Sequence, residues 1–184
     1  MGNSEHGVIE RERKYKLGEA AAARLRVRLE EVGRFVREER QDTIVLKDRA
    51  SHLKKGAYLR YRTVEGRAEL THKGPKQAQG KDKWRLEHTI ALGDGPALEL
   101  LEKMGFRPNT RYVKDTAIFL YRGVLVSVDR IVGIGWFCEM ETDDLERDLD
   151  AVAAALELDD DAVETRGYPT IAAEAAREKI AARA

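Results

Sequence analysis

The stretch Glu10-Arg11-Glu12-Arg13-Lys14, inside residues 8–17, decides the fold. Its charged residues alternate in a pattern that is typical of a β-strand, in which successive side chains point to opposite faces. Glu10, Glu12 and Lys14 therefore share one face. Two carboxylates and an ammonium group that point the same way from one strand are the first indication of a charged site.

The same spacing recurs in four later segments, whose charged or polar residues are again two positions apart. These same-face pairs are Arg60 with Arg62, Thr71 with Lys73, Arg85 with Glu87, and Glu139 with Glu141. The intervening residues are mostly apolar, as in Leu59 and Tyr61. For a single strand, such alternation is typical of a face exposed to water. Repeated in five segments, with acids at the two ends of the chain and bases between them, it favours a sheet that closes around a charged interior.

Period-two patterns predict eight strands: 8–17, 42–46, 58–64, 67–73, 83–92, 110–121, 123–130 and 136–142. Apolar stripes and glycine stops predict four helices over residues 17–32, 96–104, 143–156 and 169–184. Hairpin-length turns at 64–67 and 121–123 favour antiparallel pairing. The segment from Gly74 to Lys83 is interpreted as a mobile loop that could act as a lid. The sequence thus predicts an α+β fold: a closed eight-stranded antiparallel β-barrel with helices packed outside, in one domain over residues 1–184.

Composition limits the possible functions. Of the 184 residues, 33 are Lys or Arg and 33 are Asp or Glu, so the chain has no net charge that would attract nucleic acid or an anionic membrane. No run of eighteen apolar residues predicts a membrane span. Cys138 is the single cysteine and alternates with glutamates, so we expect it under a helix, outside any disulfide. We expect a cytoplasmic protein with no nucleic-acid or membrane partner, either a monomer or a homodimer.

The charges of such a cavity predict its ligands. Two carboxylates about 5 Å apart at an effective dielectric constant near 20 repel each other by roughly 3 kcal/mol. A divalent cation such as Mg²⁺ relieves this repulsion through oxygen ligands, and Arg and Lys bind phosphate oxygens. A polyanion bridged by a metal ion would match both the acidic and the basic side chains of the cavity. The alternative for Arg85 and Glu87 is a cross-strand ion pair without a ligand role. His72 and His88 lie on the opposite faces and are expected outside the cavity.

The motifs, taken in order, resemble the CYTH superfamily of triphosphate tunnel metalloenzymes, which includes class IV adenylyl cyclases, thiamine triphosphatases and inorganic triphosphatases. The resemblance covers nearly the entire chain, from the Glu-x-Glu-x-Lys at residues 10–14 to the Glu-x-Glu at 139–141. It implies Mg²⁺ or Mn²⁺ bound by Glu10, Glu12, Asp129, Glu139 and Glu141. It also implies phosphate contacts or catalytic roles for Lys14, Arg60, Arg62, Lys73, Arg85 and Lys114, with Glu87 orienting a basic neighbour.

One position departs from the family pattern. The sixth strand of the family has Lys-x-Arg, and this chain has Lys114-Asp115-Thr116. Thr116 therefore stands where a phosphate-binding guanidinium is expected. Arg111 and Arg122 are the nearby basic residues that could replace it, although their strand parity or distance along the chain is unfavourable.

Three functions follow as hypotheses, each with a triphosphate-bearing small molecule as the partner. The first is metal-dependent hydrolysis of inorganic triphosphate, thiamine triphosphate or a nucleoside triphosphate. The second is class IV adenylyl cyclase chemistry, which converts ATP to cyclic AMP and pyrophosphate and requires a site for the base. The third, motivated by Thr116, is binding of polyphosphate or nucleotide without turnover.

Overall fold

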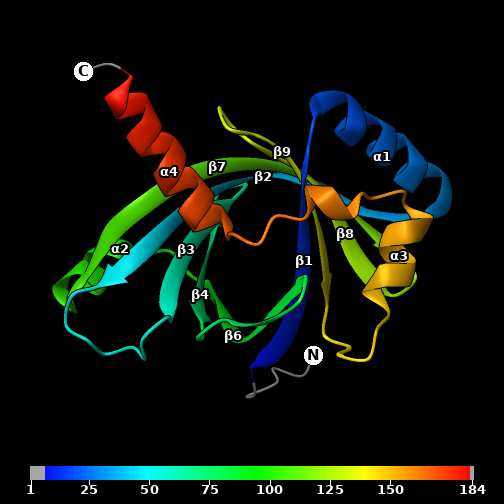
Figure 1. The fold of residues 1–184 in the computed structure, drawn as a ribbon. Coiled ribbons are helices and arrows are strands. Elements are labelled where there is room, and N and C mark those ends of the chain that lie inside the picture. Colours follow the sequence, from blue (N-terminus) through cyan, green and yellow to red (C-terminus); the bar gives the residue numbers. More distant parts are fainter. Residues whose placement is uncertain (1–6, 183–184) are drawn as a thin grey trace.

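The computed structural model describes residues 7–182, and nine strands organise it (Figure 1). All of their pairings are antiparallel, as the hairpin turns predict. The strands are β1 (Val8–Leu17), β2 (Arg34–Asp48), β3 (Tyr58–Val64), β4 (Arg67–Lys73), β5 (Gln77–Gln79), β6 (Asp82–Leu92), β7 (Phe106–Tyr121), β8 (Val124–Ile131) and β9 (Gly135–Thr142).

Eight of these strands close into a barrel, which confirms the predicted fold. Their order is β1-β9-β8-β7-β2-β3-β4-β6, and β6 pairs again with β1. The closing register places Glu10 opposite Arg85, and on the other side of β1 Glu12 lies opposite Glu141. Residues from both ends of the sequence therefore meet on neighbouring strands, with their alternate side chains directed to the interior.

Helices cover parts of the outer face of the barrel. They are α1 (Glu19–Val32), α2 (Ala97–Lys103), α3 (Leu149–Ala155) and α4 (Tyr168–Ala181), with a 3₁₀ turn at Asp160–Ala162. Figure 1 shows α1 and α3 together on one side of the molecule and α2 on the other. None of the helices in residues 7–182 combines the length and apolar character that a membrane span requires.

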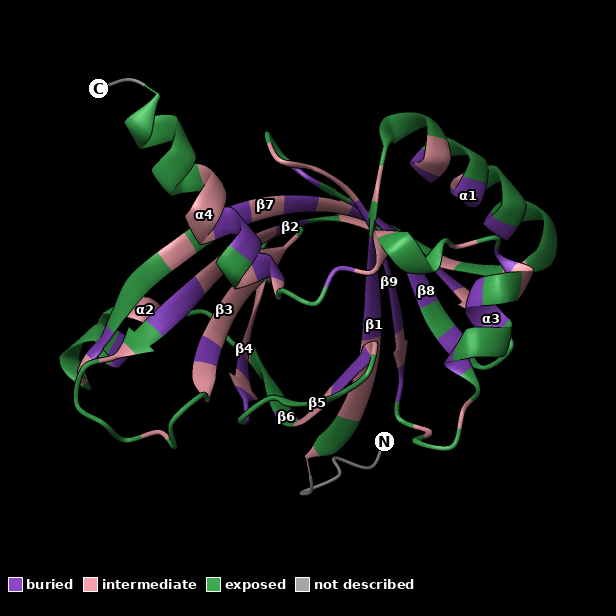
Figure 2. Ribbon diagram, viewed as in Figure 1, coloured by how far each residue is buried: buried purple, intermediate pink, exposed green. Residues whose placement is uncertain are grey.

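The largest apolar cluster lies between the barrel and the helices α1 and α3. Leu29 of α1 and Val152 of α3 pack in one cluster with outward-facing Phe119, Cys138 and Met140, all buried. Figure 2 shows this buried band along the strands beneath α1 and α3. Cys138 is thus a small buried side chain under the helices, as expected. Since this cluster uses the outer face of the strands, most of the inner face is free to carry charge.

Two smaller clusters attach the remaining helices. Leu101 of α2 packs on Leu46 and Leu59 at one end of the barrel. Ile171 of α4 packs with Ile131 and Phe137, which face inward on β8 and β9 like Lys114 and Glu139 of the cavity. These contacts hold the first turn of α4 against the barrel and so fix the position of its first residue, Tyr168.

Element boundaries differ from prediction where tertiary pairing extends a strand or a cap shortens a helix. Leu17 is the last residue of β1 and pairs with Trp136, so α1 begins at Glu19. β2 is much longer than residues 42–46, because nearly its whole length pairs with β7. α3 begins only at Leu149, where the carboxylate of Asp148 accepts a hydrogen bond from the Ala151 amide at 2.9 Å.

The segment predicted as a mobile loop is largely a hairpin. Gln77–Gln79 form β5 and pair with residues 82–84 of β6. Asp82 is buried and accepts hydrogen bonds from Arg11 Nε at 2.8 Å and Arg13 Nε at 2.6 Å. The interpretation of residues 74–83 as a loop was therefore wrong. Its composition of Gly, Gln and Lys carries no signal of the ion pairs that attach it to β1.

Candidate functional site

The interior of the barrel contains a cavity of about 1000 Å³. Eleven of the twelve side chains predicted as site residues line it, and together they come from β1, β3, β4, β6, β7 and β9. They are Glu10, Glu12, Lys14, Arg60, Arg62, Lys73, Arg85, Glu87, Lys114, Glu139 and Glu141. The twelfth, Asp129, lies outside the lining. The alternation seen in the sequence therefore does correspond to one charged interior.

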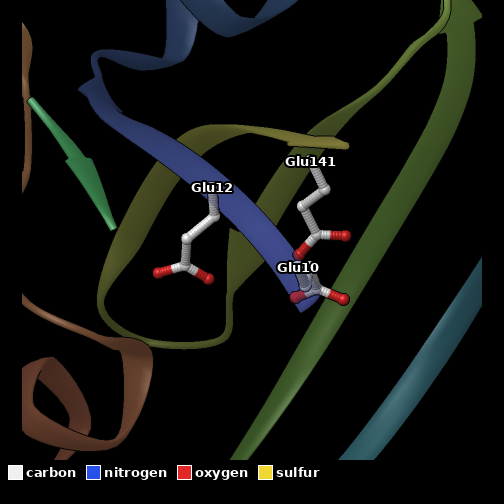
Figure 3. Close-up of side chains that lie close together, drawn as sticks. All are labelled: Glu10, Glu12 and Glu141. Carbon is white, nitrogen blue, oxygen red and sulfur yellow. The ribbon is translucent and has the colours of Figure 1, made fainter. Parts of the chain in front are cut away.

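Three carboxylates converge on one wall of the cavity. Glu10, Glu12 and Glu141 each place an oxygen within 4.8 Å of the others. Glu12 and Glu141 are cross-strand partners on β1 and β9, and Glu10 lies two residues before Glu12 on the same face. Figure 3 shows the side chain of Glu141 directed toward that of Glu10. Oxygen ligands of this kind and number suit a hard divalent cation such as Mg²⁺ or Mn²⁺.

The four cavity glutamates of β1 and β9 differ in their nearest cations. Glu12 lies 2.7 Å from Lys83 Nζ, and Glu139 lies 2.6 Å from Lys14 Nζ. Glu10 lies 3.8 Å from Lys73 Nζ. Glu141 makes no ion pair among the residues that the structure describes. The negative charge is therefore least compensated at Glu10 and Glu141.

The pKa values follow this difference. Burial, only partly offset by Lys73, raises the pKa of Glu10 to about 7. Burial together with the neighbouring Glu10 raises the pKa of Glu141 well above its usual range. Burial acts in the same direction on Glu12, but Lys14 and Lys83 outweigh it and lower its pKa. Two carboxyls that resist ionisation without a further positive charge fit a site for a cation.

Facing the acids is a basic wall that the protein holds in place. Arg60 donates to Thr71 Oγ1 at 3.0 Å and lies 3.6 Å from Glu69, while Arg62 lies 3.5 Å from the same carboxylate. Glu69 and Thr71 belong to the adjacent strand β4. Guanidinium groups held in this way are preorganised to bind phosphate oxygens. The sequence analysis did not identify Glu69 as a cavity residue.

Lys73, Glu87 and Arg85 extend the basic wall onto β4 and β6. Glu87 forms a buried ion pair with Lys73, so it contacts a basic neighbour as the resemblance implies. Arg85 does not pair with Glu87 and instead lies over the Tyr58 ring, 5.5 Å from its centroid. Of the cross-strand ion pairing considered as the alternative for these two residues, Glu87 therefore shows it, with its partner Lys73 on β4, and Arg85 does not.

Tyr168, the first residue of α4, separates Asp129 from the cavity. Its hydroxyl donates to Asp129 Oδ2 at 2.6 Å, and Lys114 Nζ lies 3.2 Å from the same oxygen. Lys14 Nζ lies 4.1 Å from the centre of the Tyr168 ring. Asp129 is fully buried here and is not one of the three clustered carboxylates. Its role as a metal ligand, like that of Glu139, stays a prediction that the geometry does not support directly.

Thr116 and its suggested substitutes do not supply a guanidinium to the cavity. Thr116 is buried beside Asp129 and is not part of the cavity lining. Arg111 is exposed and pairs with Asp42, 3.0 Å from Nε to Oδ1. Arg122 lies at the β7–β8 turn over the Tyr121 ring. The suggestion that Arg111 or Arg122 replaces the expected arginine was therefore wrong.

The structure adds two further basic side chains to the site and corrects one histidine. Lys83, on the buried end of β6, reaches Glu12 from the segment that was predicted as a loop. Arg37 of β2 lines the cavity, although its strand was predicted to begin only at Asp42. His88 is exposed and contributes to the cavity lining, whereas His72 does not, so only His72 agrees with the expectation.

Comparisons with known proteins agree with this geometry. A conserved hypothetical protein from Pyrococcus furiosus is 25% identical, with a TM-score of 0.74 over 88% of this chain and 99% of that one. A candidate adenylate cyclase from Vibrio parahaemolyticus is 22% identical, with a TM-score of 0.70 over 90% of this chain and 98% of that one. A candidate adenylyl cyclase from Hippeastrum, described as having a dominant triphosphatase activity, is 14% identical, with a TM-score of 0.64 over 87% and 91%.

No curated protein sequence matches the chain. The family model for the CYTH domain, however, matches residues 8–168, which run from the first strand to the first residue of α4. This range includes every side chain that lines the acidic and basic walls described above. The charged barrel and the sequence match together show that the chain belongs to the CYTH domain family.

Proposed function

We propose that the protein hydrolyses a triphosphate-bearing small molecule in its barrel, with a divalent cation held by Glu10, Glu12 and Glu141. The observation that carries this proposal is the position of three clustered carboxylates opposite a basic wall inside one cavity. When bound, the cation would neutralise phosphate charge and lower the pKa of a coordinated water. CYTH proteins are metal-dependent, and the raised pKa values of Glu10 and Glu141 fit such an occupant.

The basic side chains supply binding and orientation. Arg60 and Arg62 present donors that Thr71 and Glu69 already hold, so little side-chain entropy is lost when they bind phosphate. Lys14 and Lys114 add two ammonium groups, which lie 4.1 Å and 5.3 Å from the centre of the Tyr168 ring. Hydrolysis of a phosphoanhydride requires alignment of the chain and stabilisation of spread negative charge, and these groups are placed to provide both.

Cavity aromatics favour hydrolysis over cyclisation. A cyclase must also bind the adenine base, for which an open aromatic ring is the usual platform. Tyr58 is covered by Arg85, and Lys14 and Lys114 lie against Tyr168, so these two rings already have cationic partners. Tyr112, the remaining tyrosine of the lining, is buried. The exposed His88 ring of the lining lies 5.9 Å from the His72 ring. None of the tyrosines that the structure describes in the cavity therefore presents an open ring to a base.

Product analysis tests the proposal. The protein would be incubated with Mg²⁺ or Mn²⁺ and, in parallel, with tripolyphosphate, thiamine triphosphate and ATP. We expect orthophosphate release, reduced on the order of 100-fold or more by Glu141→Gln. Glu99→Gln on α2 makes the same chemical change at an exposed ion pair with Lys103 and should leave the rate unchanged.

Other products would decide against hydrolysis. Cyclic AMP with an equal amount of pyrophosphate would establish cyclase chemistry in this barrel. Tight binding of all three compounds with no product would establish a binding protein. Orthophosphate release that Glu141→Gln leaves intact would show that the acidic cluster is not the site of reaction.

A further inference from the structure

Arg37 is a guanidinium in the cavity lining that the proposed function has not yet used. It lies on β2, on the opposite side of the basic wall from the acids of β1 and β9 in the order of strands. Its side chain is about half exposed, at 54%, so a ligand can reach it. Gln41, four residues further along β2 and therefore on the same face, also lines the cavity.

Regular alternation along β2 places Arg37 inside the barrel. Arg37 pairs with Ile118 and Gln41 pairs with Lys114 without a break in register, and all four residues line the cavity. A β-bulge follows on the N-terminal side, where Phe35 pairs with Phe119, so that β2 has one residue more than β7 between the two pairs. Phe35 packs on the outward Phe119 ring with centroids 5.6 Å apart. The bulge at Val36 therefore turns Phe35 outward and makes Arg37 the last inward side chain of β2 before the irregularity.

Neighbouring side chains then hold the guanidinium near Thr116. Arg37 Nε donates to Glu39 Oε2 at 3.0 Å, and Gln41 Nε2 donates to the other oxygen of Glu39 at 2.6 Å. Glu39 is the cross-strand partner of Thr116. The Arg37 guanidinium is thus held by the side chain opposite Thr116, the position on β7 at which the family motif has an arginine.

We propose that Arg37 is a phosphate-binding residue of this cavity and takes the place of the guanidinium that Thr116 does not supply. This inference rests on the proposed function, since it assumes that the cavity binds a phosphate chain. It assigns to β2 a contact with the bound polyanion, so the anion-binding surface extends from β3 across β2 to Lys114 on β7. Glu39 and Gln41 act as positioning residues for that contact.

Binding of tripolyphosphate without added metal, measured by titration calorimetry in EDTA, tests the inference without requiring turnover. We expect Arg37→Ala to weaken binding on the order of tenfold, as for a lost charge-assisted hydrogen bond. Arg40→Ala is the matched control, because Arg40 lies three residues away, is 65% exposed and pairs with Asp115 on the outer face. It should bind like the wild-type protein. Arg60→Ala reports separately whether the cavity is the binding site.

Adding Thr116→Arg to Arg37→Ala should recover most of the lost affinity, because the new side chain arises opposite Glu39. Wild-type affinity in Arg37→Ala, together with weak binding in Arg60→Ala, would overturn the role of Arg37 and leave the proposed function standing. Equal losses in Arg37→Ala and Arg40→Ala would also overturn it, since net charge alone would explain them. If the double variant folds but still binds weakly, the inference that Arg37 takes the place of an arginine at position 116 would be contradicted. No binding by the wild-type protein, either in EDTA or with added Mg²⁺, would instead contradict the proposed function.

Discussion

At the scale of single residues, the cavity shows how one side-chain chemistry acquires different properties from its surroundings. Glu12 and Glu139 each contact an ammonium group within 2.7 Å, whereas Glu10 has only Lys73 at 3.8 Å. The first two therefore act as internal counter-ions for Lys83 and Lys14. The negative charges of Glu10 and Glu141 are less well compensated by nearby cations, so these two residues are the better candidates for metal ligands.

The raised pKa of Glu10 predicts a pH-dependent stability of the metal-free protein. With a pKa of about 7 when folded and 4.5 as its model value, the folded state holds more protons between these pH values, so stability falls as the pH rises through that window. We expect Glu10→Gln to stabilise the protein at pH 8 by up to roughly 3 kcal/mol and to have little effect at pH 4. Urea unfolding in EDTA at both pH values measures this difference. An equal shift at pH 4 and pH 8 would contradict the pKa assignment.

At the scale of elements, the β5–β6 hairpin joins the inside of the barrel to its outside. Lys83 contacts Glu12 in the interior, and the preceding residue, Asp82, binds Arg11 and Arg13 on the outer face of β1. Arg13 also reaches Asp150 of α3 at 2.7 Å. The hairpin is thus held by the ion pairs of Asp82 on the outer face of the barrel and by the contact between Lys83 and Glu12 on the inner face.

Removal of Asp82 should destabilise the fold, because it leaves the buried Arg13 with only part of its counter-charge. We expect Asp82→Ala to lower the free energy of unfolding by about 3 kcal/mol. Asp160→Ala, which removes the exposed partner of Lys81 at the tip of the same hairpin, should change it very little. Chemical unfolding at neutral pH measures both variants. Similar stabilities for the two would mean that the Asp82 network does not hold the hairpin.

At the scale of the whole molecule, the barrel separates its two tasks by face. The outward side chains form the largest apolar cluster with α1 and α3, and the inward side chains form a cavity lined by acids and bases next to the smaller cluster under α4. A ligand whose charges match this interior binds only to the folded protein and therefore stabilises it. Ligand-dependent stabilisation therefore reports on the entire charged interior at once.

Thermal unfolding with Mg²⁺ and tripolyphosphate should show this coupling. At a ligand concentration 100 times the dissociation constant, the stabilisation is about 2.7 kcal/mol. For a chain of this size that raises the Tm by about 5 to 10 °C. Glu141→Gln should lose the part that depends on Mg²⁺ and retain the part that tripolyphosphate produces alone. A wild-type Tm that neither ligand changes would argue against a binding cavity.

Much of the site could be predicted from the sequence, because side-chain alternation is a local property. A period of two places Glu10 and Glu12, or Arg60 and Arg62, on one face whatever the rest of the chain does. The antiparallel barrel was predicted because the charged faces of several strands could share one interior, while helices could cover their apolar faces. For this reason eleven of the twelve predicted side chains line the cavity.

Only the tertiary structure decided which of these groups meet. Arg37 joins the cavity because β2 pairs with β7 along almost its whole length, and the sequence pattern had predicted this strand only over residues 42–46. Likewise Tyr168 covers Asp129 only because α4 docks on the barrel, and Lys83 reaches Glu12 only because β6 closes onto β1. The sequence by itself determined the faces of the strands, since alternation is set by local backbone geometry. Barrel closure between distant segments determined the partners, and the partners set the charge and the pKa of each group.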